Sequence, residues 1–150
     1  MASLVKAAQI TKSRPKTSFK LRTVERRRYS GGKGQKIGFI GLGEMGFRMA
    51  RNLARKNISV VAFDVKSAPI DQLRAEFPNF VTAVDSPANV VKSQADTIVT
   101  MLPEPKHVLD CYRDAATSLF SASPKPGTYF IDSSTIDPGT ARIVAAEAKN

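Results

Sequence analysis

The sequence has 150 residues, 42% of them hydrophobic, which is typical of one globular domain. One cysteine excludes an internal disulfide and a cysteine-rich zinc site, and no apolar run reaches the roughly 18 residues of a membrane-spanning helix. The net charge of +10 lies almost wholly in residues 1–34, which hold ten Lys or Arg and one acid. Because a nucleic-acid-binding domain carries its positive charge on a folded face, we expect neither nucleic acid nor a membrane as partner.

Residues 1–29 have the composition of a mitochondrial transit peptide, rich in Lys, Arg, Ser and Thr with scattered apolar residues. The run from Arg27 to Ser30 resembles a matrix-protease signal, which predicts cleavage between Tyr29 and Ser30 and delivery to the mitochondrial matrix. The alternative is a disordered basic tail that binds anions loosely. Residues 30–35 form a Gly-rich linker without the spacing of a P-loop.

The body, residues 36–150, alternates short apolar runs with helical stretches. Continuous rather than alternating apolar residues indicate parallel strands that are covered on both faces. Such alternation predicts an α/β fold, a doubly wound parallel sheet of the Rossmann type. The predicted strands are Lys36–Ile40, Ser59–Phe63, Phe80–Ala83, Thr97–Met101 and Thr128–Ile131.

Helical spacing is clearest in two places. Met45, Met49 and Leu53 recur every four residues, which predicts that they face the core. A second stripe is expected to form one helix face, and Pro105 and Pro138 suit first helical turns, the latter behind Asp137 as N-cap. The second stripe consists of Val108, Cys111, Tyr112, Ala115 and Leu119.

The first strand runs into a glycine motif, G-x-G-x-x-G, that opens a helix. Gly41 permits a tight turn, Gly43 lets a pyrophosphate approach the backbone, and Gly46 lets the helix pack close to the strand. Free N–H groups and the positive end of the helix dipole then face the phosphates. The motif predicts a dinucleotide cofactor held by Gly41, Leu42, Gly43, Glu44, Met45 and Gly46.

Asp64 closes the second strand, 18 residues after the last glycine. A carboxylate at this place accepts hydrogen bonds from ribose hydroxyls and repels a 2′-phosphate. Lys66 softens that repulsion, but no Arg follows Asp64 directly. The sequence therefore predicts NAD rather than NADP.

Three motifs together resemble the β-hydroxyacid dehydrogenase family: residues 37–46 around the glycines, Met101-Leu102-Pro103 after the fourth strand, and residues 132–138, DSSTIDP, after the fifth. The last is closest to a mitochondrial member that acts in valine breakdown. The resemblance covers residues 36–150. It implies an NAD-dependent oxidoreductase that transfers a hydride from a small hydroxy acid, and a homo-oligomer for the full-length enzyme.

By the same resemblance, Leu102 and Pro103 would border the cofactor, Thr135 would contact its nicotinamide, and Ser134 would face the substrate. The family's catalytic Lys and its Ser-Gly-Gly segment lie further along the chain than Asn150. We therefore expect no catalytic residue here, and a Rossmann-type domain cut before the family's helical C-terminal domain. Another β-hydroxyacid dehydrogenase and a non-catalytic NAD-binding short isoform remain open.

His107 and Cys111 each have two possible roles. His107, the only histidine, falls near the predicted cofactor and is either a cofactor contact or a surface helix residue. Cys111 lies on an apolar stripe, which favours buried packing over a redox role. No arrangement of residues indicates a metal site.

Overall fold

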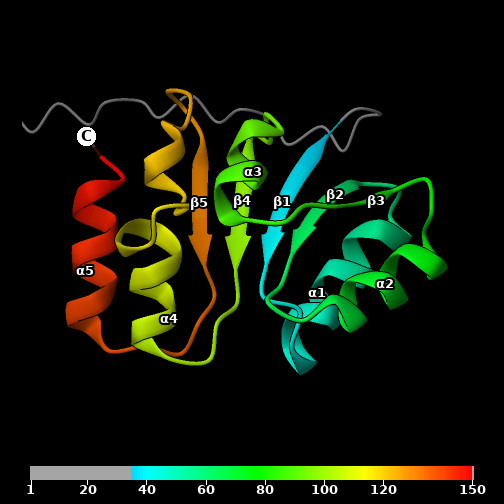
Figure 1. Ribbon diagram of the computed structural model, residues 1–150, viewed down its shortest axis with the longest axis horizontal. Coiled ribbons are helices and arrows are strands. Elements are labelled where there is room, and N and C mark those ends of the chain that lie inside the picture. Colours follow the sequence, from blue (N-terminus) through cyan, green and yellow to red (C-terminus); the bar gives the residue numbers. More distant parts are fainter. Residues whose placement is uncertain (1–34, 150) are drawn as a thin grey trace, which may run out of the picture.

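The computed structural model describes residues 35–149, which form a five-stranded sheet in the order β3-β2-β1-β4-β5, parallel throughout (Figure 1). The predicted transit peptide, its cleavage site and residues 30–34 of the linker lie outside the described residues. The strands are β1 (Lys36–Ile40), β2 (Ser59–Phe63), β3 (Val81–Ala83), β4 (Thr97–Thr100) and β5 (Tyr129–Asp132). The helices are α1 (Glu44–Arg55), α2 (Ser67–Glu76), α3 (Pro87–Lys92), α4 (Pro105–Leu109) and α5 (Pro138–Glu147).

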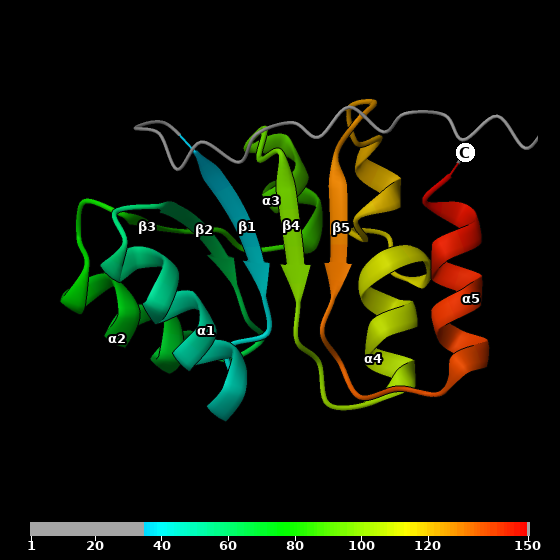
Figure 2. The same cartoon turned by 180° about the vertical axis from the view of Figure 1, so that it is seen from behind.

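Helices cover both faces of the sheet, as the predicted doubly wound fold requires (Figures 1 and 2). On one face α1 and α2 bury a core around Phe39, Val60 and Leu73. On the other face α3, α4 and α5 bury a core around Ile98, Val108 and Tyr112. Among the described residues, no helix has the length and apolar character needed to cross a membrane.

The predicted strands agree with the observed ones to within one residue at each end. Pro105 and Pro138 do begin helices, and the Asp137 carboxylate caps α5 by accepting the Thr140 N–H at 2.9 Å. The strand runs are recognisable because parallel strands buried on both faces need continuous apolar sequence.

The prediction of one long helix with a stripe from Val108 to Leu119 is wrong. Helix α4 ends at Leu109 and continues as a single π-helical turn, Asp110–Asp114, after which Ala115 is extended and exposed. Leu119 is buried, but from the following turn, where its N–H donates to the Cys111 carbonyl at 2.8 Å. The wider π turn, which follows i→i+5 bonding, rotates the chain off the expected face.

Strand β5 is one edge of the described sheet and is covered on one face only. Phe130 packs in the core with Tyr112 and Phe120, edge to face. Tyr129 and Ile131, which point to the opposite face, are 58% and 46% exposed. The described residues therefore leave an apolar strip along β5 in contact with solvent.

Candidate dinucleotide-binding site

The loops that carry the three sequence motifs all leave the same edge of the sheet. Parallel strands end together, and the loops after β1, β4 and β5 emerge side by side at the lower edge in Figures 1 and 2. The order of strands reverses between β1 and β4, which makes this edge the topological switch point where ligands bind in such folds.

The glycine loop has the geometry that its sequence predicts. Gly41 has φ +89°, and a Cβ there would lie 2.2 Å from the Met101 carbonyl oxygen. A Cβ on Gly46 would lie 1.9 Å from the Gly41 carbonyl oxygen, so α1 packs directly against the loop. A Cβ on Gly43 would meet nothing within 4 Å, because this glycine faces open space. Of these three glycines, only Gly43 leaves room for a ligand.

Helix α1 begins at that open position. Its N-cap is Gly43, with no side chain to accept a hydrogen bond from the first turn. The first N–H groups of a helix lack intrahelical partners and carry the positive end of the dipole. Glu44 points its charge to solvent and lies 3.5 Å from Arg48. The helix thus offers backbone donors to an anion.

Asp64 is fixed by two backbone donors. One carboxylate oxygen accepts the Leu42 N–H of the glycine loop, and the other accepts the Lys66 N–H at 2.8 Å. Since a carboxylate has about four lone-pair sites, both oxygens can still accept hydrogen bonds from a ligand. The Asp64 side chain is therefore held in place and still has acceptor sites for a ligand.

A cavity of about 650 Å³, the size of an ordinary ligand site, joins these elements. It runs from the end of β2 past the glycine loop to the loop after β4, and its lining is mostly apolar. Nine of the predicted cofactor residues line it: Gly41, Gly43, Glu44, Met45, Gly46, Asp64, Leu102, Pro103 and His107.

Three predicted residues do not line the cavity. The Leu42 side chain is buried in the core, and only its N–H serves the site, through Asp64. Ser134 and Thr135 lie on the loop after β5, outside the lining. The Ser134 hydroxyl donates to Asp132 at 2.6 Å and accepts the Leu102 N–H at 2.9 Å, so it joins two loops.

Met45 is not a core residue as the spacing predicts, for it is 57% exposed and lines the cavity. It occupies the first turn of α1, and the start of this helix lies beyond the ends of the strands (Figures 1 and 2). Met49, one turn later, packs against the core.

Other residues of the lining lie outside the predicted set. Val65, which directly follows Asp64, lines the cavity and is 89% exposed. The sequence does carry a signal for this residue, because it is an apolar residue that follows an acid at a strand end. Pro87, Asp110 and Thr117 come from separate segments that meet only in the fold.

His107 and Cys111 both line the cavity. The His107 ring is half-exposed, with Nδ1 3.9 Å from a Glu104 carboxylate oxygen. Cys111 is buried as expected, and burial raises the pKa of its thiol to about 12, helped by the negative charge of Asp132. A thiol with that pKa is protonated near neutral pH and is a poor nucleophile.

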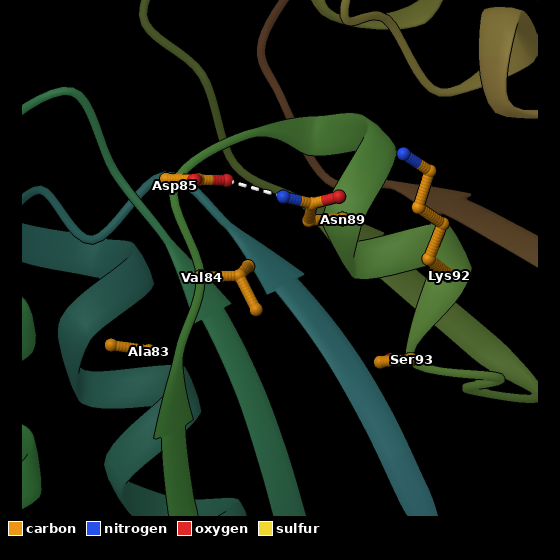
Figure 3. Close-up of a pocket in the computed structure, with 6 residues that line it drawn as sticks. All are labelled: Ala83, Val84, Asp85, Asn89, Lys92 and Ser93. Atoms are coloured by element: carbon orange, nitrogen blue, oxygen red, sulfur yellow. Dashed lines mark hydrogen bonds between the residues drawn. The ribbon is translucent and has the colours of Figure 1, made fainter.

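Two further hollows have a different character. Figure 3 shows one between the end of β3 and α3, where Asp85 accepts a hydrogen bond from the Asn89 side chain and so stabilises the start of α3. It shares no lining residue with the cavity at the glycine loop. The other lies between the ends of β2 and β3 and shares Phe63, Asp64 and Val65 with it. Within residues 35–149, no group of His, Cys, Asp or Glu is arranged to hold a metal ion.

Comparison with known proteins agrees with this geometry. Residues 36–150 match the family described as the NAD binding domain of 6-phosphogluconate dehydrogenase. A probable mitochondrial 3-hydroxyisobutyrate dehydrogenase of Dictyostelium discoideum is 43% identical over 113 residues, which cover 75% of this chain and 33% of that protein. The chain thus spans about a third of the length of this curated relative.

Solved structures show the same fold. The 3-hydroxyisobutyrate dehydrogenase of Mycobacterium tuberculosis, solved with L-serine, superposes with a TM-score of 0.67 at 36% identity, over 77% of this chain and 36% of that one. Psf3, solved with NADP+ and 2-OPP, superposes with a TM-score of 0.67 at 26% identity, over 75% and 38% of the two chains. The chain therefore belongs to the β-hydroxyacid dehydrogenase family, and its residues 36–150 form the domain that binds a nicotinamide cofactor.

Proposed function

We propose that this chain is the cofactor-binding part of a mitochondrial matrix enzyme that oxidises 3-hydroxyisobutyrate to methylmalonate semialdehyde in valine catabolism, with NAD as hydride acceptor. The observation that carries the proposal is that the open face of Gly43 and the fixed carboxylate of Asp64 share one cavity. The names of the Dictyostelium and Mycobacterium relatives support the substrate, and the former supports the compartment.

In this proposal the cofactor lies across the ends of three strands, β2, β1 and β4. The start of α1 donates backbone N–H groups to the pyrophosphate, and Asp64, after β2, accepts from the hydroxyls of the adenosine ribose. Because these sites occupy β1 and β2, the other half of the dinucleotide extends toward β4, where Leu102 and Pro103 line the cavity. Bound there, the nicotinamide ring supplies the hydride acceptor.

Asp64 also favours NAD over NADP. A 2′-phosphate would bring negative charge against a carboxylate that two backbone N–H groups hold in place. Lys66 is exposed and makes the repulsion weaker without removing it. A residual affinity for NADP is therefore expected.

In this proposal, no lysine within residues 35–149 transfers the proton. Lys106 forms an ion pair with Asp110 at 2.6 Å, and Lys125 forms one with Asp96 at 2.7 Å. Both lysines are exposed and held by their own partners. We expect residues 1–150 alone to bind the cofactor without oxidising substrate.

The specific alternative is a β-hydroxyacid dehydrogenase acting on another small hydroxy acid. The presence of L-serine in the solved Mycobacterium relative favours this alternative. A non-catalytic NAD-binding short form is the other reading of the same site.

Titrating the purified chain with NADH and NADPH, by calorimetry or nucleotide fluorescence, tests the binding proposal. Saturable binding with NADH tighter than NADPH is expected, and absence of saturable binding by folded chain would refute it. Transcript sequence beyond the codon for Asn150 tests the enzyme. The expected transcript encodes a downstream Ser-Gly-Gly segment and a helical Lys. The enzyme that it encodes should turn over 3-hydroxyisobutyrate faster than it turns over L-serine. A stop codon would favour the non-catalytic form.

A further inference from the structure

A chain of hydrogen bonds connects the core to the two loops at the β4 side of the cavity. The Asp132 Oδ1 atom accepts from the Thr100 hydroxyl at 2.9 Å and from the Ser134 hydroxyl at 2.6 Å. The Ser134 Oγ atom accepts the Leu102 N–H at 2.9 Å. Through Ser134, the loop after β5 is therefore tied to the loop after β4.

The directions of these bonds follow from counting protons. Thr100 has one hydroxyl proton, which goes to Asp132, so the Tyr112 hydroxyl donates to Thr100 across 3.1 Å. The Ser134 hydroxyl likewise has one proton, which it donates to Asp132, and one of its oxygen lone pairs accepts the hydrogen bond from the Leu102 N–H. Tyr112 and Thr100 are fully buried, so the chain is anchored at its inner end. Successive bonds pointing to one carboxylate polarise and strengthen each other.

The end of this chain lies beside the cavity rather than in it. Ser134 is not among the lining residues, whereas Leu102 and its neighbour Pro103 are. A hydroxyl that already donates to a carboxylate has no proton left for a ligand. What it can do is fix the main chain at Leu102 and thus the wall next to the β4 end of the cavity.

We propose that Ser134 is a positioning residue whose hydroxyl, held by Asp132, fixes the loop at Leu102 and thereby shapes the end of the cavity that takes the nicotinamide. This rests on the proposed function, which puts the adenosine at Asp64 and the nicotinamide at the β4 side. It assigns Ser134 to cofactor placement and not to contact with the substrate.

Ser133 provides a matched control. It is the adjacent serine, its N–H donates to the Thr100 carbonyl at 2.9 Å, and within the described part of the chain its hydroxyl makes no hydrogen bond. Ser133→Ala removes the same atom as Ser134→Ala one residue away. Ser134→Thr keeps a hydroxyl and serves as the rescue.

The experiment compares NADH with ADP-ribose, which lacks the nicotinamide, on the full chain without substrate. Ser134→Ala is expected to weaken NADH binding by roughly threefold to tenfold, the range for loss of one hydrogen bond, and to leave ADP-ribose binding unchanged. Ser133→Ala should bind both ligands as the unmodified chain does, and Ser134→Thr should recover most of the NADH affinity. A global folding defect would instead lower the affinity for both ligands.

A second readout needs no cofactor. Amide hydrogen exchange at Leu102 should become faster in Ser134→Ala and stay unchanged in Ser133→Ala. Should Ser134→Ala fail to fold, Asp132→Ala removes the carboxylate that holds the Ser134 hydroxyl, and Asp132→Asn, which keeps the Oδ1 acceptor, should restore that contact.

The outcomes are distinct. Unchanged NADH affinity in Ser134→Ala, or an equal loss for NADH and ADP-ribose, would overturn the positioning role while leaving the proposed function intact. Failure of the unmodified chain to bind either ligand would refute the proposed function and with it this role.

Discussion

The Asp64 carboxylate accepts a hydrogen bond from the main-chain N–H of Leu42, joining the end of β2 to the middle of the glycine loop. The same residue that the sequence assigns to the ribose thus also holds the loop assigned to the pyrophosphate. Asp64 and the glycine loop therefore form one preorganised unit, and a change in either is expected to affect both ends of the adenosine diphosphate.

Replacing Asp64 tests that unit. Asp64→Ala should weaken NADH by about tenfold or more, because a charge-assisted hydrogen bond contributes about 1.5–3 kcal/mol. NADPH should be weakened less, because the repulsion of its 2′-phosphate is lost at the same time. Fluorescence titrations with both nucleotides measure the ratio, with Asp114→Ala, an exposed acid outside the cavity lining, as the control. A constant NADH/NADPH ratio would contradict the assignment.

Two glycines of one motif should behave in opposite ways. Gly43 has φ −64°, which any residue adopts, and open space where a Cβ would go. Gly43→Ala should therefore keep its Tm and lose roughly tenfold or more in NADH affinity, as expected for a methyl group placed against a bound pyrophosphate. Gly46→Ala drives a Cβ into the Gly41 carbonyl and should lower stability by about 1–3 kcal/mol even without ligand.

Thermal unfolding and NADH titration of both variants separate the two effects. A Gly43→Ala variant that binds NADH normally would show that the cofactor does not approach the loop at this point.

Much of this architecture follows from the sequence because local and long-range signals agree. The strand Lys36–Ile40 is a continuous apolar run, its end carries glycines that a tight turn demands, and Asp137 precedes Pro138 at a helix start. Each of these features is decided within a few residues. Such features are the ones that the sequence predicts correctly.

The predictions are wrong where the environment of a residue depends on parts of the chain outside its own helix or strand. The spacing of Met45 matches a core face, yet the position of that turn beyond the ends of the strands depends on the length of β1 and its loop. Ala115 continues an apolar stripe, and nothing local signals the π turn before it. Likewise the contact of Ser134 with Leu102, which lies in the loop after β4, becomes known only when the sheet register is known.

Cys111 should be inert in the folded chain. At pH 8 an unperturbed thiol, whose pKa is about 8.5, is partly ionised, but burial raises the pKa of Cys111 to about 12. A disulfide reagent should therefore modify Cys111 far more slowly in the native chain than in denaturant, and Cys111→Ala should remove the signal. Rapid modification of native chain at pH 8 would contradict the burial.

The same raised pKa predicts how stability depends on pH. Because the unfolded thiol ionises first, the protonated native thiol favours the fold fully below about pH 8.5 and loses this contribution as the pH rises toward 12. The free energy of unfolding of the unmodified chain, compared with Cys111→Ala, should fall more steeply in that range. Parallel curves would show that Cys111 ionises equally in both states.

The basic N-terminal segment should direct import. Residues 1–34 fused to a fluorescent protein should accumulate in mitochondria, and N-terminal sequencing of the imported product should begin at Ser30. Replacing Arg27 and Arg28 with Gln should impair cleavage at that bond. Mature protein with residues 1–29 intact would contradict the transit-peptide prediction, and salt-dependent DNA binding lost with the segment would favour a basic tail.

The apolar strip on β5 should make the chain associate with itself. Tyr129 and Ile131 are exposed on an edge strand. The main-chain groups along the outer side of this strand can also form hydrogen bonds with a strand of another chain. Sedimentation should show concentration-dependent assembly of the unmodified chain, and Tyr129→Lys with Ile131→Thr should shift it toward monomer. NADH affinity should stay within about twofold, because neither residue lines the cavity, both side chains lie on the uncovered face of β5, and substitutions that share no partner are nearly additive. A chain that is monomeric at every concentration, with a high and sharp Tm, would mean that solvent alone satisfies this edge.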